Sequence, residues 1–113
     1  MTDEALRLLH RIIGLSVMCS DQHRVGRVDD VLLNPRTSRA EWIAVRPSQL
    51  SRQVTPIPAE YTTIEGIDVH TPYTTLDVRN APRYRAHASL TKLDQKRLQS
   101  YWRGRPLTDS STQ

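Results

Sequence analysis

The sequence has few of the residues from which many common functional sites are built. Its 113 residues include one cysteine, four glycines and no phenylalanine, and aromatic residues make up 5%. The single cysteine, Cys19, excludes an internal disulfide and is typical of a reducing cytoplasm, and we expect it to be a small semi-buried side chain. Four glycines are too few for a glycine-rich phosphate loop, and none of the four histidines has a metal-site spacing. We therefore expect no cofactor and no metal.

The sequence also lacks a long hydrophobic run. No stretch approaches the roughly 20 apolar residues that a membrane span needs, and the mean hydropathy is −0.56. The N-terminus holds two acids and no uninterrupted apolar run, which is unlike a secretory signal. The length fits one domain with a core of its own but leaves little room for a deep cleft. These features predict a cytoplasmic protein without a small-molecule substrate.

Positive charge is unevenly distributed along the chain. The net charge is +4, yet residues 1–82 carry nine arginines against ten acids. Residues 83–113 carry seven basic residues against two acids. A basic segment of this kind is able to contact phosphate or an acidic protein surface, although it is also typical of a solvated tail.

Short apolar runs between polar, glycine and proline turns predict a β-rich fold. The expected strands cover residues 15–19, 24–33, 39–46, 54–57, 61–64 and 67–70. A turn at Asn34-Pro35 joins the second and third strands into a hairpin. The spacing from Val28 to Val31 breaks the period of two, which predicts a bulge near Asp29-Asp30 or burial on both faces. Leu76 and Val78 fit one last short strand or turn.

Helices are expected at both ends of the chain. Residues 1–11 form an N-terminal helical lead, and residues 83–106 form a basic extension that contains a short amphipathic helix. This second helix starts at the cap Thr91, has an acid three residues later, and stops at Gly104. Residues 107–113 are expected to be disordered.

The central segment resembles a known family. The motif begins with Gly14-Leu15-Ser16-Val17 and continues through Val25-Gly26-Arg27-Val28-Asp29-Asp30-Val31-Leu32-Leu33-Asn34-Pro35. The strand around Trp42, then Ile57-Pro58, and finally Asn80-Ala81-Pro82 complete it. Over residues 12–82 this pattern resembles the PRC-barrel family. The residues that carry the family motif are Gly14, Val17, Val25, Gly26, Val28, Asp30, Pro35, Trp42, Pro58 and Pro82.

The resemblance implies an architecture and a class of function. The fold would be mainly β, a small barrel of five to six short antiparallel strands with short flanking helices at both ends. The family supplies the cytoplasmic domain of the photosynthetic reaction-centre H subunit and a domain of a ribosome-maturation factor. It therefore implies a prokaryotic, non-enzymatic protein that acts as a docking or adaptor module. Its partner would be another protein or a second copy of itself, so that a homodimer is expected.

Two turns depart from the family pattern. Gln22 and Ser38 stand where the family usually has glycine. If these corners need a left-handed backbone, each side chain costs roughly 1 kcal/mol. Either the two turns take a different shape here, or the barrel tolerates the strain.

The C-terminal helix supplies the candidate binding residues. These are Arg97, Tyr101, Trp102 and Arg103. Tyr101 and Trp102 share one helix face with Leu98, which favours packing onto the barrel with the charges left at the rim. Alternatively, basic and aromatic groups together pair phosphates and stack bases, which would make the protein an RNA- or ribosome-associated factor.

An enzyme is the least favoured interpretation, and no catalytic residue is assigned. Asp68 and His70 lie on the same side of a strand, where they could bind a metal or relay a proton, but a surface pair is the simpler interpretation. Asp29 and Asp30 are adjacent in a strand, so their side chains are expected on opposite faces and unable to share a proton.

Overall fold

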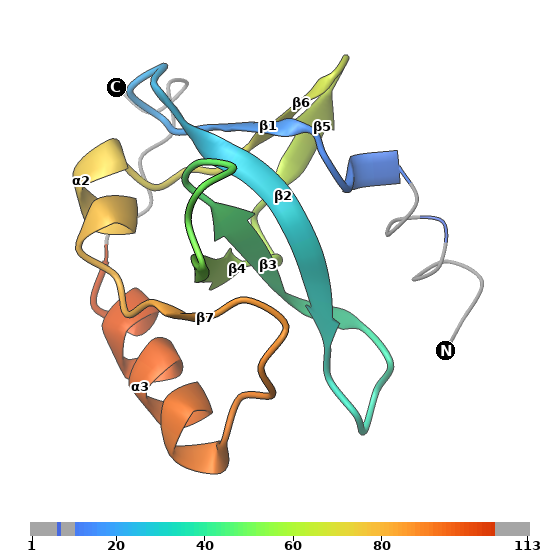
Figure 1. The fold of residues 1–113 in the computed structure, drawn as a ribbon, viewed down its shortest axis with the longest axis vertical. Coiled ribbons are helices and arrows are strands. Elements are labelled where there is room, and N and C mark those ends of the chain that lie inside the picture. Colours follow the sequence, from blue (N-terminus) through green and yellow to red (C-terminus); the bar gives the residue numbers. More distant parts are fainter. Residues whose placement is uncertain (1–6, 8–10, 106–113) are drawn as a thin grey trace.

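Short strands make up most of the fold, and two labelled helices lie in the second half of the chain (Figure 1). The structure is a computed structural model that describes residue 7 and residues 11–105. The strands are β1 (Ser16–Met18), β2 (Arg24–Leu33), β3 (Ala40–Arg46), β4 (Gln53–Pro58), β5 (Thr63–Glu65), β6 (Asp68–His70) and β7 (Tyr84–Arg85). The helices are α2 (Thr75–Arg79) and α3 (Lys92–Arg103).

The strands form one sheet in the order β5-β6-β1-β2-β3-β4-β7. Neighbours are antiparallel except β1 and β6, which are parallel. β5 and β7 end this order, so the sheet is not closed on itself. The fold is mainly β as expected, but the expectation of five to six antiparallel strands in a barrel is corrected. The described chain has seven strands, one pair of them parallel, in an open sheet.

Two elements near residue 80 differ from the sequence-based expectation. The segment with Leu76 and Val78 is the helix α2, because the Thr74 side chain accepts a hydrogen bond from the Asp77 backbone N–H and caps it. β7 lies in the basic extension, where no strand was expected, and pairs its two residues with Gln53 and Val54 of β4. A strand of two residues is too short to show a periodic pattern in the sequence. It is recognised only by its pairing with a partner strand.

The local signals for the main hairpin and for α3 are confirmed. β2 pairs with β3, and the register shifts between Val28 and Asp30 at the expected bulge. Thr91 and Asp94 form a reciprocal capping box at the start of α3. The expected lead over residues 1–11 lies mostly outside the described residues, and the expected tail over residues 107–113 lies wholly outside them.

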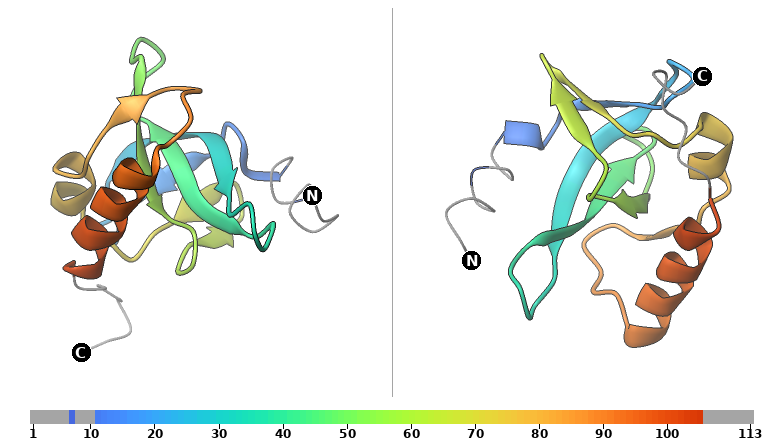
Figure 2. Two further views of the ribbon diagram at one scale, coloured as in Figure 1. Left: turned by 90° about the horizontal axis from the view of Figure 1, so that it is seen from below. Right: turned by 180° about the vertical axis from the view of Figure 1, so that it is seen from behind.

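The sheet curls around an apolar core that both helices complete. α2 and α3 lie on the same flank of the sheet (Figures 1 and 2). The buried apolar strand residues that face this core include Val17, Val28, Ile43, Val45, Ile57 and Val69. α2 adds Val78, and α3 adds Leu98 and Trp102. The basic C-terminal segment therefore supplies part of the core.

The two turns that depart from the family pattern are both left-handed. Gln22 has φ 67° and Ser38 has φ 57°. The alternative of a different turn shape is therefore wrong, and the fold tolerates side chains where glycine is the least strained residue.

Substitution of Ser38 by glycine is expected to raise the melting temperature. Removing the Cβ relieves a left-handed strain of about 1 kcal/mol, which corresponds to about 3–6 °C in a domain of this size. Thermal unfolding followed by circular dichroism measures the shift. Ser89→Gly is the matched control, because Ser89 is exposed and is not among the positive-φ residues, so that no gain is expected. An unchanged or lower midpoint for Ser38→Gly contradicts the prediction.

Candidate functional site

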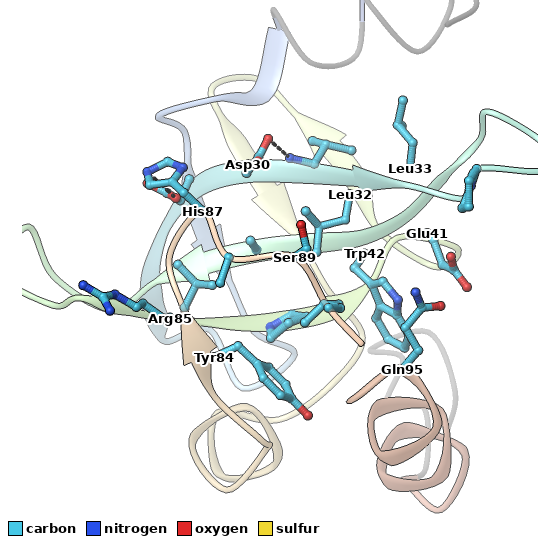
Figure 3. A pocket seen from close by; sticks show the side chains of 18 residues that line it. Asp30, Leu32, Leu33, Glu41, Trp42, Tyr84, Arg85, His87, Ser89 and Gln95 are labelled. Atoms are coloured by element: carbon cyan, nitrogen blue, oxygen red, sulfur yellow. Dashed lines mark hydrogen bonds and ion pairs between the residues drawn. The ribbon is translucent and has the colours of Figure 1, made fainter. Parts of the chain in front are cut away.

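A groove with a volume of about 480 Å³ lies on the outer face of β2, β3 and β4 (Figure 3). The outward-facing strand residues that form its floor are Asp30, Leu32, Trp42, Ala44 and Pro56. The chain from Tyr84 to Leu90, together with Gln95 of α3, forms the opposite wall. A volume of this size lies within the range of about 300–1,000 Å³ that is usual for ligand sites.

The strand register explains why this face is apolar. Trp42 pairs with Leu32, and Ala44 pairs with Asp30, so these side chains share one face of the sheet. The intervening residues Ile43 and Val45 face the core. The sheet is thus covered on both sides, which accounts for the unbroken buried run from residue 42 to residue 45.

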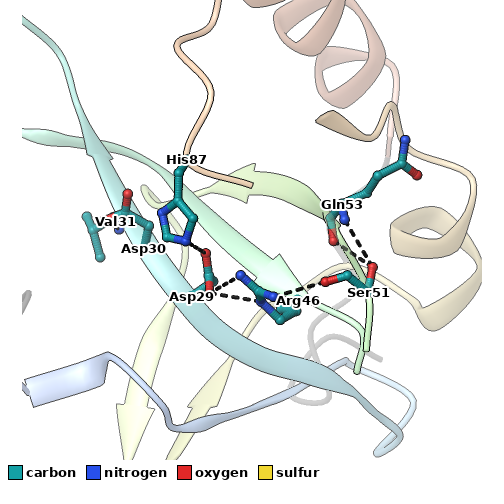
Figure 4. A network of polar contacts seen from close by, with 7 residues as sticks. All are labelled: Asp29, Asp30, Val31, Arg46, Ser51, Gln53 and His87. Atoms are coloured by element: carbon teal, nitrogen blue, oxygen red, sulfur yellow. Dashed lines mark hydrogen bonds and ion pairs between the residues drawn. The ribbon is translucent and has the colours of Figure 1, made fainter. Parts of the chain in front are cut away.

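A polar network closes one end of the groove at the β2 bulge (Figure 4). Arg46 donates from Nε and from Nη2 to Asp29 Oδ1, each at 2.9 Å. Its Nη1 donates to the Ser51 carbonyl at 2.9 Å. His87, from the groove wall, places Nε2 at 3.8 Å from Asp29 Oδ2. The network therefore ties the wall and the β3–β4 loop to the bulge.

The bulge also changes the expected placement of the two acids. Asp29 and Asp30 both line the groove, so the expectation of opposite faces is wrong. A bulge inserts an extra residue and breaks the alternation of side chains. The two carboxylates nevertheless have separate partners, because Asp30 Oδ1 accepts from the Val31 N–H at 2.8 Å while Asp29 binds Arg46.

The floor of the groove carries a buried donor without a partner. Trp42 is 5% exposed, and its Nε1 has no hydrogen-bond partner among the described residues. In Figure 3 its side chain lies beside those of Gln95 and Glu41 at one end of the groove. Buried polar groups are nearly always paired in folded proteins, so this donor departs from the usual pattern.

The four candidate binding residues on α3 do not form one surface. Arg97 and Arg103 are exposed, whereas Trp102 is 3% exposed and donates from Nε1 to the Pro56 carbonyl at 2.9 Å. The half-buried Tyr101 donates its hydroxyl to the Asp77 carbonyl. The aromatic pair is therefore engaged within the fold, and the helix offers charges without a free stacking platform.

The candidate enzyme residues have ordinary surroundings. His70 Nε2 lies 3.5 Å from Glu65 Oε2 across the β5–β6 pair, and Asp68 is half-buried on the same strand. No group of three potential metal ligands occurs in the described part of the chain. Burial raises the pKa of the Cys19 thiol to about 11, so this thiol is protonated at neutral pH and is not a nucleophile.

The sequence matches the family described as PRC-barrel domain over residues 5–82. The chain belongs to the PRC-barrel family. None of the curated proteins compared with it gives a significant match. Within residues 7 and 11–105, no helix is long and apolar enough to cross a membrane.

The groove of this PRC-barrel protein is built only partly by the family domain. Its floor belongs to the matched segment, whereas the wall from residue 84 onward follows that segment. Of the motif residues, Asp30, Pro35 and Trp42 line the groove, and Val17, Gly26 and Val28 are buried in the fold. Val25, Pro58 and Pro82 are half-buried, and Gly14 is exposed. Sequence reasoning missed the groove, although the unbroken apolar run at residues 42–45 indicated a sheet covered on both faces.

Proposed function

We propose that this PRC-barrel protein is a non-enzymatic docking module of the cytoplasm that binds an extended segment of another protein. The groove over β2, β3 and β4 carries the proposal. It is lined by the half-buried Leu32, Leu33 and Leu90, which offer apolar surface to side chains of a partner. Fixed polar groups at Asp29 and Asp30 beside this apolar surface support a peptide segment as the occupant, because a peptide offers both apolar side chains and backbone donors.

The surroundings of the polar groups favour docking over catalysis. The carboxylate of Asp29 is fixed by Arg46, and that of Asp30 by a backbone N–H. The protonated Cys19 is buried and does not line the groove. A recognition site needs such fixed polar groups at its rim for orientation, whereas a general base needs a carboxylate that is free to take a proton.

Site-specific photo-crosslinking tests the proposal. A photoreactive amino acid is placed at Ser89, which is exposed at the groove, and, as a control, at Leu50, which is 93% exposed and does not line it. In nuclease-treated extracts we expect one protein, identified by mass spectrometry, to be crosslinked from Ser89 and not from Leu50. Leu32→Gln on the groove floor should abolish this product.

Two controls keep the crosslinking result interpretable. Leu76→Gln alters a leucine that is 67% exposed on α2 and outside the groove, and it should leave the product unchanged. Thermal unfolding shows whether Leu32→Gln still folds. Identical products from both probe positions, or a product that survives Leu32→Gln in a folded protein, would overturn the proposal. Loss of the product on nuclease treatment would favour the RNA-associated alternative.

Self-association is a further part of the proposal. β5 ends the sheet and pairs only with β6 among the described strands, and Ile67 beside it is 79% exposed. A free strand edge next to exposed apolar surface favours pairing with a second copy, for which about 800 Å² per partner is an ordinary interface. Sedimentation velocity should give twice the chain mass as concentration rises. A monomer mass at every concentration tested would exclude the homodimer.

A further inference from the structure

A second cavity, separate from the groove, gathers three arginines. It has a volume of about 240 Å³ and lies where β2, β3 and β4 meet α2. Arg24, Arg79 and Arg83 line it, no acidic residue does, and it shares no lining residue with the groove. We name this cavity the arginine pocket.

The fold brings these arginines together from three separate places. Arg24 is the first residue of β2, Arg79 is the last residue of α2, and Arg83 follows α2 on the way to β7. Arg24 Nε donates to Ser16 Oγ at 3.0 Å, and Arg83 Nη2 donates to the Arg79 carbonyl at 3.3 Å. Both contacts are to neutral acceptors, so they position the guanidinium groups without cancelling their charge.

Two acids at α2 have partners outside the pocket. Asp21 accepts from the Thr75 hydroxyl at 2.7 Å, and Asp77 lies 4.0 Å from Arg105. None of the three pocket arginines takes part in an ion pair within the described residues. Three like charges around one concavity repel one another, and an anion between them removes that repulsion.

The interior of the pocket has the character of a small built site. Thr55, a polar residue that is 2% exposed, and Val45, which is 1% exposed, line it. Low-dielectric walls strengthen the attraction between an enclosed anion and the guanidinium groups. The volume falls below the range of about 300–1,000 Å³ for drug-sized ligands, which favours a small anionic group over an extended one.

We propose that the arginine pocket binds a phosphate group, either as the free ion or as the terminal phosphate of a small molecule. The planar guanidinium fork matches phosphate oxygens with two parallel hydrogen bonds, and a phosphate near neutral pH carries up to two negative charges against three positive ones. The arginine pocket shares no lining residue with the docking groove, so a negative result for one proposal leaves the other unaffected.

Titration calorimetry with inorganic phosphate tests the pocket in the full chain. We expect saturable binding with one ion per chain. Arg24→Gln and Arg79→Gln should each weaken the binding roughly tenfold or more, since each removes charged hydrogen bonds. Arg36→Gln is the matched control, because Arg36 is exposed and does not line the pocket. The substituted residues Arg24, Arg36 and Arg79 are all exposed. Thermal unfolding without phosphate checks that the variants fold.

Two further ligands identify the source of the phosphate. If phosphoserine binds more tightly than inorganic phosphate, and if its affinity depends on Arg24 and Arg79 in the same way, the ligand of the pocket is a phosphate ester. Equal affinity for the two assigns it to the free ion. A single-stranded RNA without a terminal phosphate, bound through these arginines while inorganic phosphate fails to bind, overturns the proposal in favour of a nucleic-acid backbone. Equal weakening by Arg36→Gln, or no phosphate binding, also overturns it.

Discussion

Gly26→Ala is expected to unfold the protein under conditions in which the natural chain is folded. Gly26 has φ +151°, and a Cβ at this position would lie 2.2 Å from the Arg46 carbonyl oxygen and 2.8 Å from its carbonyl carbon. Both atoms belong to the backbone of the neighbouring strand, so no side-chain rotation relieves the clash. β2 and β3 would have to separate where they pair closely, and we expect a loss of about 3 kcal/mol or more.

Urea unfolding of the variant and of a glycine control measures this effect. Gly66, in the β5–β6 turn, also has positive φ, at +62°, but a Cβ there meets no atom within 4 Å. Gly66→Ala should therefore cost only the left-handed penalty of about 1 kcal/mol. If the two variants unfold at the same urea concentration, the close approach of β2 and β3 at Gly26 is wrong.

Trp102→Ala, in the C-terminal helix α3, is expected to lower the free energy of unfolding by a similar amount. The indole is 3% exposed, packs at a centroid distance of 4.5 Å from Tyr73, and donates to the Pro56 carbonyl. Truncation of a buried tryptophan costs about 3–5 kcal/mol, because packing is lost and a cavity remains. This is a large part of the 5–15 kcal/mol by which domains are usually stable.

The adjacent residue provides the control. Arg103 is exposed on the same turn of α3, and Arg103→Ala should change the free energy of unfolding by about 0.5 kcal/mol or less. Trp102→Phe should fall between the two, because it keeps an aromatic ring but leaves the Pro56 carbonyl without its donor. Denaturant unfolding gives all three values. Equal midpoints for Trp102→Ala and Arg103→Ala would contradict the placement of the indole.

The features predicted correctly from the sequence depend on chemistry within a few residues. The capping box of α3 needs only Thr91 and Asp94, and the turn between β2 and β3 needs only Asn34 and Pro35. The bulge of β2 follows from a break in the spacing of Val28 and Val31. Such signals are local, so a single sequence carries them.

The features that were not predicted depend on contacts between distant segments. Trp102 donates to the Pro56 carbonyl, which is 46 residues away in the sequence, and β1 pairs with β6 although four strands lie between them in the chain. The groove unites the outer face of β2, β3 and β4 with a wall that begins at residue 84. An amphipathic helix is recognisable from its spacing, but the surface that covers its apolar face is not.

The error about Asp29 and Asp30 has a specific cause. In a regular strand these neighbours would lie on opposite faces, but the bulge of β2 lies at these two residues. The extra residue at the bulge breaks that rule, and both acids line the groove as a result. The alternation of side chains therefore predicts which residues share a face only along the regular parts of β2.

The position of α3 sets the length of chain that folds as a unit. The family match ends at residue 82. Leu98 and Trp102, which complete the core, and β7, which pairs with β4, all follow that residue in the chain. A shortened chain that stops at residue 82 would expose apolar surface around Pro56 and Tyr73 and would be prone to aggregation. Proteolytic cleavage between β7 and α3 would release the helix in the same way. We therefore expect the smallest autonomous unit of this protein to extend through α3, and a chain without its C-terminal segment to be destabilised relative to the full chain.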